Sequence, residues 1–300
     1  MIGTVTVNGM VLSAMPMGEY DKRLTILTVE RGKISAFARG ARRPNSSLLA
    51  CSQPFSYGEF TMYAGRDSYT VSAAQIENYF PGLRQEPERA FLGMYFCEFA
   101  DYYTREGNDE REVLRLLYQS LRALESGKFS PSLVRRIFEL KLIAVEGEAP
   151  QVFECVRCRR RPGSAGSRGP NVRDGEVQPD RECGPEEEKR TEDGREADQP
   201  AAQDALTHFL MRRDGMICGK CATELDAGPG GETGNAQCRP VSAACLYAMQ
   251  YVIGTPSVRL FRFVLKEEVL EEFAAVVGQY IKKHVDREMK ALQVLESMSP

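Results

Sequence analysis

The sequence lacks the features that mark membrane and secreted proteins. Its 300 residues contain no run of about 20 apolar residues, the length that a membrane-spanning helix requires. The N-terminal region carries no Lys or Arg before Lys22, so it has no basic segment of the kind that opens a secretory signal peptide. We therefore expect a soluble protein that is not secreted and that works in a reducing compartment.

Signatures of nucleotide hydrolysis and of nucleophilic catalysis are also absent. No phosphate-binding loop of the G-x-x-x-x-G-K-[ST] type occurs, so nucleotide hydrolysis is not supported. The chain has only two histidines, His208 and His284, and neither lies in a recognisable catalytic motif. A thiol-dependent Cys–His enzyme is left open as an alternative, and we expect a protein that is not an enzyme.

Large apolar residues are missing from one long segment, residues 161–205. This segment contains no Leu, Ile, Met or aromatic residue, and it carries 7 basic and 12 acidic side chains. It cannot bury enough apolar surface to offset the entropy lost on ordering, so we predict a disordered acidic insert. The remainder has 32 basic and 30 acidic residues, a net charge of +2, although the whole chain has −3. The negative net charge of the whole chain is therefore no argument against a polyanionic ligand.

The first 80 residues have the pattern of β-strands. Apolar, β-branched and Thr residues fill five short segments that are separated by turn residues. Five strands in 80 residues suit a small closed barrel, and the five-stranded oligonucleotide-binding (OB) fold is the commonest candidate of that size. The predicted strands cover residues 5–12, 24–29, 33–38, 55–64 and 69–76.

Beyond residue 81 apolar residues recur about every 3.6 positions in place of every second position, which indicates helices. We predict an α+β multidomain protein in which an all-α domain is interrupted by a cysteine-rich module. The predicted helices cover residues 88–104, about 110–126, 131–146, 241–253 and 266–298. The predicted domains are the barrel at 1–80, the helical domain at 81–150 and 241–300, the cysteine module with its insert at 151–225, and a flexible linker at 226–240.

Four of the nine cysteines form two C-x-x-C pairs, Cys155 with Cys158 and Cys218 with Cys221. Without the 45-residue insert, 14 residues separate the pairs, which is close to the spacing of a four-cysteine zinc ribbon. Because four thiolates leave no open coordination position, we predict structural Zn²⁺ that contributes stability and not turnover. A redox pair and unligated thiols are the alternatives, and His208 is a further candidate ligand, although a solvated histidine is favoured there.

Positive charge is concentrated between residues 22 and 43, a stretch that contains seven basic residues and only one acidic residue, Glu30. This stretch overlaps the second and third predicted strands, on which OB folds bind nucleic acid through cations and stacked aromatic side chains. A solvated charged face is the alternative, but the Gly-containing loop at 39–44 favours phosphate binding. The predicted DNA-binding residues are Lys22, Arg23, Arg31, Lys33, Phe37, Arg39, Arg42 and Arg43, with Tyr20, Tyr57 and Tyr63 as further stacking candidates.

In this order, the parts resemble the RecO family of bacterial recombination mediators. The resemblance rests on GEYDK at 18–22, LTILT at 24–28 and GKISAFARGARRP at 32–44, on both C-x-x-C motifs, and on residues 280–296. It covers nearly the whole chain, and the acidic insert is the departure from the family.

The resemblance implies an OB barrel, a helical C-terminal domain and a four-cysteine zinc module. It also implies a non-enzymatic role in DNA repair and recombination in the bacterial cytoplasm, at the nucleoid. Members bind single- and double-stranded DNA, anneal complementary strands coated with single-strand DNA-binding protein (SSB), and act with RecR to help RecA onto DNA. Two alternatives stay open: a protein interaction scaffold with an incidentally charged barrel, and an RNA-binding protein with a barrel and a zinc ribbon.

Overall fold

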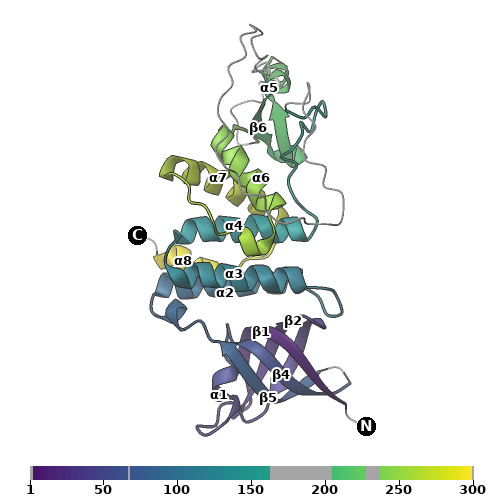
Figure 1. Cartoon of the computed structure of the whole chain (residues 1–300), viewed down its shortest axis with the longest axis vertical. Helices are drawn as coiled ribbons and strands as arrows, with labels where there is room; N and C mark the ends of the chain where they lie inside the picture. Colours follow the sequence, from purple (N-terminus) through teal and green to yellow (C-terminus); the bar gives the residue numbers. More distant parts are fainter. Residues whose placement is uncertain (1–2, 67, 163–204, 228–236, 299–300) are drawn as a thin grey trace, which may run out of the picture. The chain divides into compact units, whose positions relative to one another are not determined.

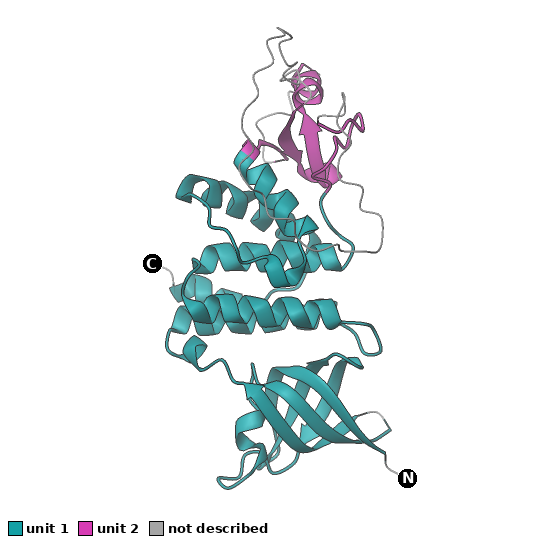
Figure 2. Cartoon of the chain, viewed as in Figure 1, with its two compact units in different colours: residues 1–150, 244–300 teal, residues 151–243 magenta. Residues whose placement is uncertain are grey.

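The computed structural model describes residues 3–66, 68–162, 205–227 and 237–298. The chain forms two compact units (Figure 2): unit 1 comprises Met1–Pro150 and Ala244–Pro300, and unit 2 comprises Gln151–Ala243. All but the first two residues and the last residue of the predicted acidic insert lie outside the described residues. In the described ranges, no helix combines the length and the apolar character needed to span a membrane.

Unit 1 begins with a closed five-stranded barrel, which confirms the predicted OB-like architecture (Figure 1). The strand order is β1-β2-β3-β5-β4, and β4 pairs with β1 to close the barrel. Neighbouring strands are antiparallel except β3 and β5, which are parallel. The strands are β1 (Thr4–Met17), β2 (Asp21–Thr28), β3 (Gly32–Ala38), β4 (Tyr57–Ala64) and β5 (Tyr69–Asn78), and the short helix α1 (Leu48–Cys51) precedes β4.

The barrel interior is filled by alternate side chains of its strands. Ile26 of β2 lies opposite Ile34 of β3, and both are almost fully buried. Gly9 of β1 lies opposite Gly58 of β4, at a place where the backbones crowd. A Cβ atom on Gly9 would stand 2.5 Å from the carbonyl oxygen of Leu27, so no larger residue fits without a backbone shift.

The rest of unit 1 is helical, and the predicted aromatic and aliphatic stripes form its core. Phe96, Phe99 and Phe138 are fully buried, and the Phe96 and Phe138 rings stack with centroids 4.2 Å apart. Gly127 ends α3 with a φ of +66°, a left-handed conformation that glycine adopts without strain. The elements are η1 (Pro81–Arg84), α2 (Pro87–Tyr103), α3 (Arg111–Ser126), α4 (Pro131–Val145), α6 (Ala243–Gly254), η3 (Ser257–Arg259), α7 (Glu267–His284) and α8 (Lys290–Met298).

The single helix predicted over 266–298 is wrong, because the chain breaks it after His284 into α7 and α8. The break has no glycine or proline and is made by contacts with α2. The Tyr102 hydroxyl donates to Asp286 Oδ1 at 2.7 Å, and the Ala291 N–H donates to Glu98 Oε2 at 3.2 Å. Glu98 thus satisfies a donor in the first turn of α8, so the break is set by tertiary structure.

A buried carboxylate joins α2 to α4. Glu139 has no exposed side-chain surface, and it accepts hydrogen bonds from Arg135 Nε at 2.8 Å and from an Arg136 guanidinium nitrogen at 2.7 Å. It also accepts from the Tyr95 hydroxyl at 2.7 Å. Burial, with the nearby Glu139 charge, raises the pKa of Tyr95 well above its usual value. With three donors, the desolvated Glu139 carboxylate is compensated, as a buried charge must be.

Unit 2 contains a small antiparallel sheet in the order β7-β6-β8. The predicted flexible linker at 226–240 is wrong at its described C-terminal end, because Cys238–Pro240 forms β8 and Cys238 is fully buried. This strand pairs with β6, so the cysteine-rich unit continues past its predicted limit at residue 225. Its elements are β6 (Leu206–Leu210), η2 (Met211–Arg213), β7 (Gly215–Cys218), α5 (Gly219–Asp226) and β8 (Cys238–Pro240).

Candidate nucleic-acid interface and metal centre

The predicted arginine loop lies against the turn between β1 and β2. The Arg42 N–H donates to the Tyr20 carbonyl oxygen at 2.8 Å, and the Gly40 N–H donates to Asp21 Oδ1 at 2.7 Å. Ala41, between the half-buried Gly40 and the exposed Arg42, is buried in the barrel core. Backbone hydrogen bonds and this buried residue therefore fix the loop, and the arginine side chains of the loop are exposed.

Four exposed arginines form what we call the arginine surface. The Arg42 guanidinium donates to the Gly18 carbonyl oxygen at 3.3 Å, and the Arg43 guanidinium carbon lies 5.1 Å from the centroid of the Tyr20 ring. Within the described residues, no arginine of this surface has an ion-pair partner. Their positive charge is therefore available to an anionic ligand. The arginine surface consists of Arg23, Arg39, Arg42 and Arg43.

Lys22 lies at the edge of this surface. Its ammonium group donates to the carbonyl oxygen of Ser52 at 2.8 Å, and its side chain is half-buried. Desolvation by burial, followed by repulsion from Arg42, lowers the pKa of Lys22 below its usual value. The repulsion shows that the positive charges of Lys22 and Arg42 lie close together.

Two of the predicted DNA-binding residues do not join the arginine surface. Lys33 is opposite Leu27, four residues along β3 from Phe37 and so about 13 Å away. The Lys33 ammonium forms an ion pair of 3.0 Å with Asp101 of α2. Arg31 lies in the turn between β2 and β3, and its guanidinium donates to the Tyr69 hydroxyl at 3.3 Å. Lys33 and Arg31 therefore lie apart from the arginine surface, and the ion pair of Lys33 attaches the barrel to α2.

The two C-x-x-C pairs meet in unit 2, as the sequence predicted. One ligand atom each from Cys155, Cys158, Cys218 and Cys221 lies within 4.8 Å of all the others, and the Cys158 and Cys218 sulfurs are 3.8 Å apart. Sulfur ligands at about 2.3 Å from a tetrahedral zinc ion stand about 3.8 Å from one another. The cluster therefore has the donor set and the spacing for a metal ion, and His208 is not part of it.

The backbone around Cys155 is arranged to stabilise the thiolate of this residue. Burial desolvates the Cys155 thiol and raises its pKa, but hydrogen bonds from the backbone N–H groups of Cys158, Cys218 and Arg157 lower the pKa to about 7. The Cys218 N–H to Cys155 Sγ distance is 3.4 Å. A metal-bound thiolate needs this kind of N–H donation, so the residues present fit a four-thiolate metal site.

The remaining described cysteines behave as small apolar side chains. Cys51, Cys97, Cys238 and Cys245 are buried. Burial raises the pKa of Cys51 and Cys97 and raises that of Cys245 to about 12, which keeps these thiols protonated and inert near neutral pH. Cys183 lies outside the described residues.

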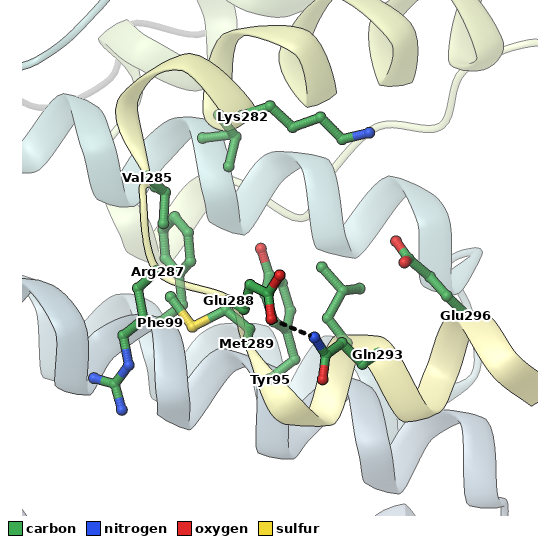
Figure 3. A pocket seen from close by; sticks show the side chains of 11 residues that line it. Tyr95, Phe99, Lys282, Val285, Arg287, Glu288, Met289, Gln293 and Glu296 are labelled. Carbon is green, nitrogen blue, oxygen red and sulfur yellow. Dashed lines mark hydrogen bonds between the residues drawn. The ribbon is translucent and has the colours of Figure 1, made fainter.

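The helical part of unit 1 contains a pocket that sequence reasoning missed (Figure 3). Its volume is about 330 Å³, and its apolar lining includes Tyr95 and Phe99 of α2, Val285 after α7, and Met289 before α8. Charged side chains of Lys282, Arg287, Glu288 and Glu296 surround it, and the Gln293 amide donates to Glu288 Oε2 at 2.8 Å. An apolar floor with a charged rim suits a protein segment that inserts one apolar side chain.

Comparison with known proteins points to a single family. The family models described as Recombination protein O N terminal and Recombination protein O C terminal match residues 1–80 and 84–190. The DNA repair protein RecO of Acetivibrio thermocellus is 26% identical over 291 residues, which cover 97% of this chain and 96% of that protein. Its counterpart in Bacillus subtilis is 26% identical over 97% of this chain and 93% of its own length. That of Alkaliphilus metalliredigens is 36% identical over 154 residues, 51% of this chain and 63% of the relative.

Proposed function

Because the chain belongs to the RecO family of DNA repair proteins, we propose that it binds single- and double-stranded DNA and anneals complementary strands without a covalent step. The observation that carries this proposal is the arginine surface, four exposed guanidinium groups on one end of an OB-like barrel. Cations on such a barrel contact phosphates, which every nucleic-acid sequence presents. Binding is then strong at low salt and largely indifferent to base sequence.

The arginine surface supports annealing through electrostatics alone. Two complementary strands repel each other through their phosphates, and the condensed counterions that weaken this repulsion must be released or rearranged on binding. Arginine side chains on a fixed loop replace those counterions. Two strands held on neighbouring parts of one surface also have a higher effective concentration for each other than they have in solution. Base pairing then supplies the specificity.

The partners and the metal of this proposal follow from the family. We propose that the protein acts on strands coated with SSB, and that RecR joins it to assist RecA loading at the nucleoid in the cytoplasm. We propose further that Cys155, Cys158, Cys218 and Cys221 hold a structural Zn²⁺ ion, which would stabilise unit 2 and supply no reactive group.

Strand annealing tests the proposed function directly. We expect the protein to accelerate duplex formation between two complementary oligonucleotides pre-coated with SSB, and we expect this acceleration to fade between 50 and 200 mM salt, roughly the range over which phosphate contacts weaken. Fluorescence quenching between end labels on the two strands measures the rate. An RNA pair of the same sequence serves as a second substrate. Equal or better annealing of RNA would favour the RNA-binding alternative, and no acceleration with no binding to bare strands would exclude the annealing role.

The pocket between α2, α7 and α8 favours a second role as a docking platform for a protein partner. We expect Leu292→Glu, which places a charge in the apolar lining, to weaken binding of purified SSB or RecR at least tenfold. Val294→Glu is the matched control, because Val294 lies on the same helix, is 39% exposed and is not part of the lining. Fluorescence anisotropy with each labelled partner measures the effect. Equal binding by both variants would show that neither partner uses this pocket.

A further inference from the structure

The strand register places one row of side chains across the outer face of the barrel. Met15 of β1 pairs with Arg23 of β2, and Arg23 pairs with Phe37 of β3. Phe37 is beside Thr70 of β5, and Thr70 pairs with Tyr63 of β4. Because paired residues of neighbouring strands share one face of a sheet, these five side chains form a continuous row, which we call the outer row.

Members of the outer row point away from the barrel core. Buried residues flank them along the strands, such as Leu24 next to Arg23 and Met62 next to Tyr63. Met15 is 65% exposed and Tyr63 is 48% exposed, although both are large and apolar, and Phe37 is half-buried. The Arg23 Nε–H donates to Ser35 Oγ at 3.0 Å, which holds the guanidinium against the outer face of β3. The row therefore combines exposed apolar and aromatic surface with one positive charge, that of Arg23.

Other aromatic residues near the barrel are already engaged. Tyr57 packs against Tyr118 with ring centroids 4.7 Å apart, and the Tyr20 ring lies under the Arg43 guanidinium. Of the stacking candidates predicted from sequence, the register thus selects Phe37 and Tyr63. It adds Met15, whose thioether also packs well against flat aromatic rings.

We propose that the outer row contacts the unpaired bases of a single strand whose phosphates lie on the arginine surface. The inference rests on the proposed DNA-binding function, and Arg23 connects the two features because it belongs to both. Neighbouring apolar members are two strands apart, about 10 Å, so each can meet a different base of an extended strand. The bases must be unpaired because a duplex hides their faces in its own stack.

This assignment separates two kinds of contact on one barrel. The arginine surface binds phosphates of single and double strands alike, whereas the outer row binds single strands only. When two held strands anneal, their bases leave the outer row and only the phosphate contacts remain. Affinity for the duplex product, which rests on phosphate contacts alone, therefore falls more steeply with salt than affinity for single strands, and the duplex is released at salt concentrations that still retain single strands.

The double variant Phe37→Ala and Tyr63→Ala tests the inference. Fluorescence anisotropy measures its affinity for a 30-residue oligo(dT), for an abasic oligonucleotide with the same number of phosphates, and for a 30-bp duplex. Stacking on one aromatic side chain is worth roughly a tenfold change in affinity, so we expect oligo(dT) binding to fall at least tenfold. Affinity for the abasic strand and the duplex should change less than twofold, because the phosphate contacts are intact. The salt dependence of oligo(dT) binding should also be unchanged.

Two further variants keep the result interpretable. Phe37→Tyr with Tyr63→Phe retains both rings and should retain oligo(dT) binding, whereas a loss in this variant would contradict stacking. Tyr79→Ala with Tyr247→Ala removes two exposed aromatic residues outside the row and should have no effect. Unchanged oligo(dT) binding by the Phe37→Ala, Tyr63→Ala variant would overturn the inference, and so would an equal loss for the abasic strand. If the unaltered protein binds no DNA, the proposed function itself fails, which is a separate outcome.

Discussion

Replacing Arg39, Arg42 and Arg43 by alanine is expected to lower the affinity for single-stranded DNA about 100-fold at 0.1 M salt. Each cation that contacts a phosphate of a single strand contributes about 0.7 to the slope of log affinity against log salt. Three lost contacts therefore reduce the slope by about 2. Between 1 M salt, where these contacts contribute little, and 0.1 M salt, this change in slope corresponds to about two orders of magnitude in affinity. Fluorescence anisotropy between 50 and 300 mM salt measures both quantities.

The fold should survive this triple change. The loop is held by the backbone hydrogen bond from Arg42 to Tyr20 and by the buried Ala41, and neither depends on the arginine side chains. The variant with lysine at all three positions keeps the charge, so it should retain most of the salt slope. A matched control removes three exposed cations of the helical part. These are Arg122, Lys128 and Arg262, which have no ion-pair partner among the described residues. An equal loss of affinity in the control would show that total charge, and not this loop, governs binding.

The barrel and the arginine loop could be predicted because their signals are local. In β3, the residues from Gly32 to Ala38 alternate between buried and half-buried, which is the period that a strand imposes on any sequence. Arg39, Arg42 and Arg43 follow directly after this strand, so their proximity needs no long-range information. The cysteine pairs are also local, and their meeting could be predicted once the insert at 161–205 was recognised by its composition.

Prediction failed where the partner of a residue is distant in sequence. Lys33 and Arg23 belong to one basic stretch, but Lys33 meets Asp101, a contact 68 residues away that no pattern in the stretch reveals. The break after α7 depends on Glu98 of α2, which receives the Ala291 N–H. The three-residue strand β8 forms through backbone pairing with β6, on the edge of β6 that β7 does not occupy. Local periodicity cannot predict such contacts, since each depends on how whole elements pack.

Loss of the proposed Zn²⁺ ion is expected to unfold unit 2 while unit 1 keeps its structure. The described sheet of unit 2 consists of strands of five, four and three residues, too little to be stable alone. Structural zinc contributes about 10–16 kcal/mol to small zinc modules, and a zinc ion held by the four cysteines would stabilise unit 2 in the same way. We expect Cys155→Ser to lose the metal and to lose amide-exchange protection in residues 205–227. Elemental analysis of the purified protein identifies the metal and its stoichiometry.

A second buried cysteine of the same unit supplies the control. Cys238 of β8 is fully buried but lies outside the cluster, so Cys238→Ser should lower stability by only about 1–3 kcal/mol and keep the metal bound. Because the arginine surface belongs to unit 1, Cys155→Ser should still bind single-stranded DNA with an affinity within about threefold of the unaltered protein. A large loss of DNA affinity in Cys155→Ser alone would mean that unit 2 also contacts DNA. Full exchange protection without metal would mean that the four thiols are dispensable for folding.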